Sequence, residues 1–410
     1  MKTVLFAWEL GEGLGHAAPL VAIADALVAL GAKSGTPVKP VFAFKDPLFA
    51  RHALGERPYA VLPAPAYPRH IKIHGDVGAF SEVLANTGFA RKGDLEVMVR
   101  AWDDLFHALD ADLVVADYSP TACVAARGRL PVMVTGNGYL VPPHTMASYP
   151  ALRGDQVSSQ SQTALLETVN AVFSERGVAP LDRLPQVLEG SARAVFTLPE
   201  LDPYRAFRDE PVLGHYHGTL TPAEPAAAPH IFYYGQTEHQ SLAEIAKAIA
   251  EAGIAMSCYC RGPESVAMRF LEIVGAEVYA EPPPLQNALA RASLVISHAG
   301  SGITHGALMV GRPQILIPDH LESSITAVRV KMMGVGEIFE PYSRLSRTKR
   351  QDGDPRTELT AMIRRLHDEP VYGERAHAVA REIERRDAPE APVNAAARIC
   401  LDLLDGTFAA

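Results

Sequence analysis

The sequence predicts an α/β protein made of two doubly wound, parallel-sheet domains in tandem that face a central cleft. Three observations support this prediction. Short apolar runs of strand type alternate with segments of helical pattern. The alternation stops near Leu201 and resumes at His230, and 410 residues exceed what one hydrophobic core usually supports. In two such domains, ligands are expected at the carboxyl ends of the sheet strands.

The N-terminal domain is predicted over residues 1–205. Its helices are expected in "HAAPLVAIADALVALG", "LEVMVRAWDDLFHAL" and "TACVAARGRL", and its strands in "TVLFAW", "PVFAF", "DLVVAD", "PVMVT" and "RAVFTL". Two stretches between these elements, "PAPAYPRHIKIHGDVGAF" and "GNGYLVPPHTMASYPALRGDQVSSQSQ", are long and irregular. Long loops in a compact domain usually bind something, so both are candidate substrate loops.

The C-terminal domain is predicted over residues 229–385, after a linker at 206–228 that contains most of the Pro/Ala-rich "TPAEPAAAPH". A last helical segment, 386–410, could pack back on the N-terminal domain. The strands of the C-terminal domain are expected in "HIFYYG", "IAMSCYC", "AEVYA", "LVISH" and "PQILIP".

Composition excludes several classes of protein. Hydrophobic residues make up 48% and charged residues 21%, as in ordinary soluble globular chains. A net charge of −9 offers no broad basic face, so nucleic acid is not an expected partner. No apolar stretch is expected to reach the ~20 residues of a membrane span, and the N-terminus has no cleavage-site pattern, so we expect a cytoplasmic protein.

The four cysteines form no C-x-x-C pair. Cys258 and Cys260, in "CYC", alternate along an apolar run and therefore share one face of a buried strand. We expect free thiols and no structural metal.

The segment from Ala292 to Gly336 is the most specific stretch of the chain. In "ASLVISHAGSGITHGALMVGRPQILIPDHLESS" a strand ends at Ser297, a glycine loop follows, and a helix begins near Gly302. Amides at a helix N-terminus carry partial positive charge and lack intrahelical acceptors, so the loop can hold phosphate oxygens. His298 lies at the end of the strand, next to this loop.

A second glycine loop, "GEGLGHAAPL", follows the first apolar run. Gly13, Gly15 and Ala18 fit the dinucleotide pattern G-x-G-x-x-G/A, but the same loop presents His16 at the start of a helix. The residues alone leave both interpretations open.

The Ala292–Gly336 segment resembles the donor-binding signature of GT-B-fold, nucleotide-sugar-dependent glycosyltransferases of the plant secondary-product and bacterial macrolide type. That signature has the elements H-x-G-x-x-[ST] and P-x-x-x-[DE]-Q, the second with Ser323 in place of Gln here. The resemblance implies that the donor contacts come from the C-terminal domain. The implied donor-binding residues are His298, Gly300, the amides of Gly302, Ile303 and Thr304, and Glu322, Ser323 and Gly235.

Members of the same family commonly begin with a strand and a G-x-GH-x-x-P loop, matched here by Gly13, Gly15, His16 and Pro19. The resemblance implies that His16 is the general base that deprotonates the acceptor and that Asp117, at the end of "DLVVAD", orients it. The irregular loops, with Tyr67, His70 and Asn137, are then candidates for acceptor contacts.

We therefore predict an inverting, metal-independent hexosyltransferase without a cofactor, which moves a sugar from a UDP- or dTDP-sugar to a hydroxyl of a small, partly apolar acceptor. Gly306 stands where many UDP-sugar members carry the Glu that binds the ribose, so the nucleotide is open. We expect a monomer or homodimer. Alternatives are a nucleotide-sugar 2-epimerase, an NAD(P)-dependent oxidoreductase with Asp46 as the ribose ligand, and a non-catalytic binding subunit.

Overall fold

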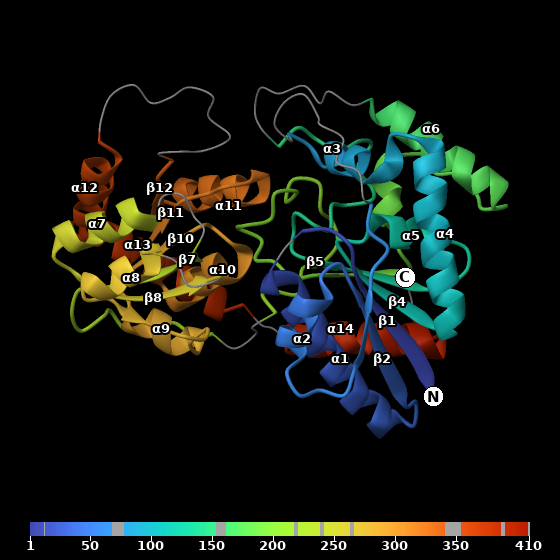
Figure 1. Ribbon diagram of the computed structural model, residues 1–410, viewed down its shortest axis with the longest axis horizontal. Coiled ribbons are helices and arrows are strands. Elements are labelled where there is room, and N and C mark those ends of the chain that lie inside the picture. The colour runs from blue at the N-terminus through green and yellow to red at the C-terminus, as the bar shows by residue number, and fades with distance from the viewer. Residues whose placement is uncertain are drawn as a thin grey trace. The chain divides into compact units, whose positions relative to one another are not determined.

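The structure is a computed structural model, and it describes residues 1–11, 13–67, 78–152, 161–216, 220–237, 242–262, 266–340, 354–386 and 390–408. The chain forms two compact units (Figure 1). Unit 1 comprises Met1–Gly218 together with Pro389–Ala410, and unit 2 comprises Thr219–Ala388.

Unit 1 contains a six-stranded parallel sheet in the order β3-β2-β1-β4-β5-β6. Its central strands are continuous apolar runs that are buried on both faces, which is the pattern expected where helices cover a parallel sheet. The strands are β1 (Lys2–Trp8), β2 (Val38–Phe44), β3 (Ala60–Pro63), β4 (Leu113–Asp117), β5 (Val132–Gly136) and β6 (Ala192–Val195).

The helices of unit 1 cover this sheet. The C-terminal helix α14 (Pro392–Asp405), red in Figure 1, lies beside α1 (Leu14–Ser34), and Cys400 and Leu27 belong to one apolar core. The other helical segments are α2 (Pro47–Leu54), α3 (Phe80–Leu84), the π-helical turn η1 (Ala85–Phe89), α4 (Lys92–Leu109), α5 (Pro120–Ala126), α6 (Gln162–Glu175) and the 3-10 turn η2 (Leu184–Leu188).

Helix α1 corrects one expectation from the sequence. Its segment Gly15–Ser34 spans 20 residues at a mean hydropathy of 1.5, which is long and apolar enough, by length and composition alone, to cross a membrane. Half of that window is buried inside unit 1. Leu20, Ile23, Ala24 and Leu27 are fully buried in the core against the sheet, which accounts for the apolar composition of the helix.

Unit 2 repeats the topology, with the strand order β12-β11-β10-β7-β8-β9. Counted from its own first strand, this is the same doubly wound order as in unit 1. Its strands are β7 (His230–Gln236), β8 (Ala255–Arg261), β9 (Glu277–Val278), β10 (Leu294–Ser297), β11 (Gln314–Leu316) and β12 (Gly336–Ile338). Its helices are α7 (Leu242–Ala252), α8 (Val266–Ile273), α9 (Leu285–Arg291), α10 (Ser301–Val310), α11 (Leu321–Met332), α12 (Pro355–Asp368) and α13 (Pro370–Glu384).

The described parts of the predicted linker, 206–228, are packed against one unit or the other. Arg208 is a buried member of unit 1. In unit 2, the Ala223 amide donates to the Val310 carbonyl at 3.1 Å, and the Arg312 guanidinium donates to the Glu224 carbonyl at 2.6 Å. The Pro/Ala-rich composition therefore marked a connection whose ends are fixed by hydrogen bonds.

The predicted pair of doubly wound parallel sheets is confirmed. The four cysteines are free and buried, as expected. Several elements were not predicted: the edge strand β3, the three-residue strand β12, and the helices α2, α3 and α6.

Candidate functional site

The first group of predicted site residues lies at the carboxyl ends of β1 and β4. These two strands are neighbours, and the chain continues from them to opposite sides of the strand order. Trp8, the last residue of β1, pairs with Asp117, the last residue of β4. In open doubly wound sheets, ligands bind at this switch point.

His16 and Asp117 meet at the switch point of unit 1. The Nδ1 atom of His16 lies 2.7 Å from Oδ1 of Asp117, and both side chains are largely or fully buried. A carboxylate at this distance favours the tautomer in which Nδ1 carries the proton and donates it to Asp117. The Nε2 atom of His16 is then the nitrogen that can accept a proton.

Two aromatic rings hold the imidazole of His16. The indole of Trp8 stacks on it at a centroid distance of 5.4 Å, and the phenol ring of Tyr118 stacks at 5.8 Å, each at an interplanar angle of 17°. Neither ring was among the predicted site residues. Both rings reach His16 because Trp8 ends β1 and Tyr118 follows β4, the two strands that flank the switch point.

Gly11 makes room for the histidine. Its φ is +80°, and a Cβ at this position would lie 2.5 Å from Nε2 of His16 and 3.1 Å from Cδ1 of Tyr118. A Cβ on Gly15 would meet nothing within 4 Å. The glycine loop is therefore shaped around His16, and Gly11 is the glycine at which a side chain would collide with Nε2.

The turn after β4 is tied back to β1. The Leu10 amide donates to the Tyr118 carbonyl at 3.1 Å, and the Thr121 amide donates to the buried carboxyl of Glu9 at 3.1 Å. Burial raises the pKa of Glu9 to about 8. Tyr118 itself has φ +46°, an uncommon conformation for an aromatic residue. These two hydrogen bonds fix the turn that contains Tyr118, the residue that follows Asp117.

Of the predicted acceptor-loop residues, two are described and one is not. The Tyr67 hydroxyl donates to Asp94 at 2.6 Å, at the start of α4. The Asn137 side-chain oxygen accepts the amides of Tyr139 at 3.0 Å and Leu140 at 3.1 Å, so it closes the turn after β5. His70 lies outside the described residues.

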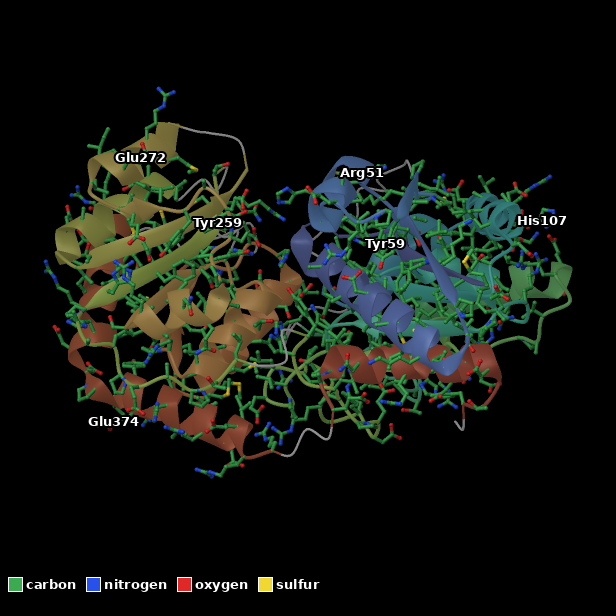
Figure 2. All side chains as sticks on the ribbon, turned by 90° about the horizontal axis from the view of Figure 1, so that it is seen from below. Arg51, Tyr59, His107, Tyr259, Glu272 and Glu374 are labelled. Carbon is green, nitrogen blue, oxygen red and sulfur yellow. The ribbon has the colours of Figure 1, made fainter. Side chains whose placement is uncertain are left out.

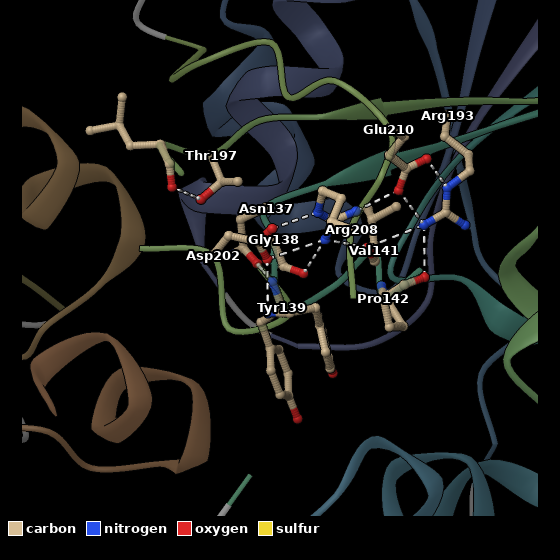
Figure 3. Close-up of polar contacts among 12 residues, drawn as sticks. Asn137, Gly138, Tyr139, Val141, Pro142, Arg193, Thr197, Asp202, Arg208 and Glu210 are labelled. Atoms are coloured by element: carbon tan, nitrogen blue, oxygen red, sulfur yellow. Dashed lines mark hydrogen bonds and ion pairs between the residues drawn. The ribbon is translucent and has the colours of Figure 1, made fainter. Parts of the chain in front are cut away.

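A largely buried ion network donates hydrogen bonds to the turn after β5 (Figure 3). Arg208 pairs with Asp202 and Glu210 and donates to the Val141 carbonyl at 2.9 Å. Arg193 also pairs with Glu210, at 2.7 Å, and it donates to the Pro142 carbonyl at 2.7 Å. These charged side chains position the loop that carries Tyr139. The ring of Tyr139 packs against the ring of Phe80 at a centroid distance of 5.8 Å.

The second group of site residues lies at the equivalent switch point of unit 2. His298 follows β10, whose neighbour is β7, and the ring of Tyr234 on β7 stacks on the imidazole at 6.1 Å. Burial lowers the pKa of His298 to about 4, so the ring is neutral near pH 7. Its Nδ1 atom is buried and has no hydrogen-bond partner among the described residues.

Helix α10 begins three residues after His298 with Gly300 as its N-cap, and no side chain caps it. The amide of Thr304 donates to the Gly300 carbonyl at 3.1 Å, so it is already used within the helix. The amides of Ser301, Gly302 and Ile303 are the ones that helix geometry leaves without intrahelical acceptors. Gly300 is required because a Cβ there would lie 2.6 Å from Nε2 of His298.

The remaining predicted donor residues occupy different settings. Glu322 lies, partly exposed, in the first turn of α11. The Ser323 hydroxyl is buried and caps the same helix, accepting the amides of Asp319 and His320 at 3.1 Å each. Gly235 leaves space for the Tyr233 hydroxyl, which a Cβ would meet at 2.2 Å. Across the described ranges, no group of three or more His, Cys, Asp or Glu side chains is placed to hold a metal ion.

A known family model matches the C-terminal part of the chain. Residues 274–399 match the model of the erythromycin biosynthesis protein CIII-like C-terminal domain. The NDP-glycosyltransferase YjiC of Bacillus licheniformis is 32% identical over 111 residues, which is 26% of this chain and 28% of that protein. The elloramycin glycosyltransferase ElmGT of Streptomyces olivaceus is 35% identical over 117 residues, 28% of this chain and 25% of that protein. The chain thus aligns with about a quarter of the length of these curated relatives.

Solved structures match over the whole chain. The calicheamicin glycosyltransferase CalG4 has a TM-score of 0.64 at 19% identity, covering 99% of both chains. The glycosyltransferase VinC, in complex with dTDP, has a TM-score of 0.61 at 14% identity, covering 98% of this chain and 100% of that one. The chain has the GT-B fold of these enzymes, and the predicted resemblance to macrolide-type GT-B glycosyltransferases is confirmed.

Proposed function

We propose that this protein is an inverting glycosyltransferase that moves a sugar from a nucleoside diphosphate sugar to a hydroxyl of a small, partly apolar acceptor. The observation that carries the proposal is the contact of 2.7 Å between His16 and Asp117 at the switch point of unit 1. In this proposal unit 1 binds the acceptor and supplies the base, and unit 2 binds the donor.

His16 acts as the general base. Nε2 takes the proton of the acceptor hydroxyl while the acceptor oxygen bonds to the anomeric carbon and the bond from that carbon to the phosphate oxygen breaks. This single displacement inverts the configuration at the carbon. Asp117 stabilises the imidazolium that forms, as the acidic member of a Ser-His-Asp triad does.

The leaving diphosphate is stabilised by unit 2 without a metal ion. The free amides at the N-terminus of α10 point partial positive charge at the phosphate oxygens. His298 is neutral near pH 7, so it contributes a hydrogen bond and no formal charge. Glu322, in the first turn of α11, is the proposed partner of the sugar hydroxyls.

Packing around Gly306 favours thymidine diphosphate over uridine diphosphate. A Cβ at Gly306 would lie 2.9 Å from Leu285, 3.1 Å from Leu289 and 3.2 Å from Leu220. A side chain here would have to displace the ends of these leucines, and glycine itself supplies no carboxylate for a ribose 2′-hydroxyl. Two structural neighbours were solved with the deoxyribose nucleotide, VinC with dTDP and SsfS6 with thymidine diphosphate.

We place the enzyme in the cytoplasm, as a monomer or homodimer. The four buried free thiols suit a reducing compartment.

The test is steady-state glycosyl transfer by the wild type, His16→Ala and Asp117→Asn, with acceptors found by screening hydroxyl compounds. Loss of the base is expected to lower kcat by roughly 10²–10⁴-fold, while the Kd for dTDP stays nearly unchanged. Asp117→Asn is expected to lower the same parameter by less. His107→Ala is the control, because His107 is an exposed histidine of unit 1 (Figure 2). Near-normal turnover in His16→Ala would remove the assignment of the base.

A further inference from the structure

Arg261 lies at the carboxyl ends of the strands of the unit 2 sheet, as His298 does. It is the last residue of β8 and pairs with Gln236, the last residue of β7. The Thr237 amide donates to the Arg261 carbonyl at 2.9 Å, which extends the pairing beyond the ends of both strands. Since β7 is also the neighbour of β10, Arg261 and His298 are separated by one strand.

Arg261 also projects to the same face of the sheet as the His298 group. Cys258 and Cys260 point into the core on one face of β8, so Tyr259 and Arg261 point to the other. On that face, the Tyr259 ring contacts Tyr234 at 5.4 Å, and Tyr234 stacks on His298. Figure 2 shows Tyr259 on β8 of unit 2. Arg261 therefore continues a row of side chains that leads to His298.

The proposed donor site needs a positive charge that the predicted residues do not supply. A nucleoside diphosphate is a dianion or more at neutral pH, whereas His298 is neutral and α10 carries no Lys or Arg. Arg312, close in sequence to α10, is buried and already donates to the carbonyls of Leu289 and Ala290, at 2.9 Å each. Burial is the main cause of the lowered pKa of His298, the charge of Asp319 opposes it, and the charge of Arg261 lowers the pKa further as the smallest of the five causes.

We propose that Arg261 binds the diphosphate of the donor, together with the α10 amides and His298. This inference rests on the proposed function, because it names a further ligand of the same donor. Guanidinium is suited to the role, since its planar fork can bond two phosphate oxygens at once. The arginine also stabilises the leaving group, on which negative charge develops during transfer.

The experiment compares dTDP and thymidine by calorimetric titration, using the full chain as wild type and as Arg261→Gln, Arg261→Lys and Arg291→Gln. Arg291 is the matched control. It lies just before β10, at the amino end of that strand, and its side chain is 51% exposed. Its replacement by Gln changes the net charge by the same amount as Arg261→Gln. Thymidine reports the nucleoside contacts without the phosphates.

Arg261→Gln is expected to weaken dTDP binding by about 10- to 100-fold, because hydrogen bonds to charged groups are the strong ones. Arg261→Lys should lose less affinity for dTDP, and Arg291→Gln should bind dTDP as the wild type does. Thymidine should bind all four proteins with the same affinity. Added salt should weaken dTDP binding more in the wild type than in Arg261→Gln.

The outcomes separate this inference from the proposal it rests on. If the wild type binds neither dTDP nor UDP, the proposed glycosyl transfer is wrong. If the wild type binds dTDP and Arg261→Gln binds it within twofold of the wild type, the donor site stands and the role of Arg261 is refuted. Equal losses for dTDP and thymidine would also refute it, because they would show that Arg261 shapes the nucleoside pocket.

Discussion

Alanine at Gly11 should disable His16 without removing it. The added Cβ would lie 2.5 Å from Nε2, about 1 Å closer than an ordinary contact between carbon and nitrogen. Either the imidazole moves by that amount or the methyl group covers the nitrogen. A misplacement of about 1 Å at a reacting centre can cost about 10²-fold in rate, so kcat for transfer should fall by roughly that factor in Gly11→Ala.

The substitution also strains the backbone, so the control has to carry the same strain. Gly35 has φ +83°, against +80° for Gly11, and a Cβ on Gly35 meets nothing within 4 Å. Alanine in this conformation costs roughly 1–2 kcal/mol at either position. Both variants should therefore lose at least this much stability in urea unfolding, and only Gly11→Ala should lose activity. If kcat of Gly11→Ala stays within a few-fold of Gly35→Ala, the idea that a side chain at position 11 displaces or covers Nε2 is refuted.

Two further predictions concern buried charges of unit 1. Arg208→Met should destabilise the protein by about 3–5 kcal/mol in urea unfolding, because Asp202 stays buried without its partner. The control is Arg57→Met, which breaks an exposed ion pair of 2.7 Å with Asp25 and should cost only about 0–1 kcal/mol. Equal losses would contradict this reasoning. Glu9 has its pKa raised by burial from 4.5 to about 8, so its contribution to stability is full below about pH 4.5 and is lost as the pH rises towards 8. Glu9→Gln stays neutral, so its stability relative to the wild type should rise by up to about 1.4 kcal/mol per pH unit between about pH 5 and pH 8; parallel curves for the two proteins would show that Glu9 does not titrate in this way.

The strands that carry the site could be predicted because their sequence signal is local. β1 and β4 are unbroken apolar runs that end in a polar residue or a glycine loop, and this is visible without knowing the partners of the strand. β3 is four residues long, its burial pattern mixes exposed and half-buried positions, and it lies at the edge of the sheet. Edge strands need less apolar surface, so their sequence signal is weaker.

The residues around each histidine were harder to predict, because their roles depend on contacts between distant parts of the chain. Ser323 stands where the motif has Gln, and only the structure shows that its hydroxyl caps α11. Asn137 lay in a candidate loop, but its side chain closes a turn. Arg261 belongs to no recognised motif. Only the pairing of β7 with β8 places it near His298, at the carboxyl ends of the strands.

The two switch points share one physical solution, although their sequences differ. In each, a histidine lies at the carboxyl edge of the sheet against a glycine that could not carry a side chain: Gly11 beside His16 and Gly300 beside His298. In each, a residue other than glycine has a left-handed backbone next to a site residue: Tyr118 after Asp117 at φ +46°, and Ala299 after His298 at φ +59°. Such conformations cost free energy and persist only where the surrounding structure enforces them. Because the rest of the fold stabilises both turns, the imidazoles are held in place before any ligand binds, which is what the proposed general base and the proposed phosphate-binding group each require.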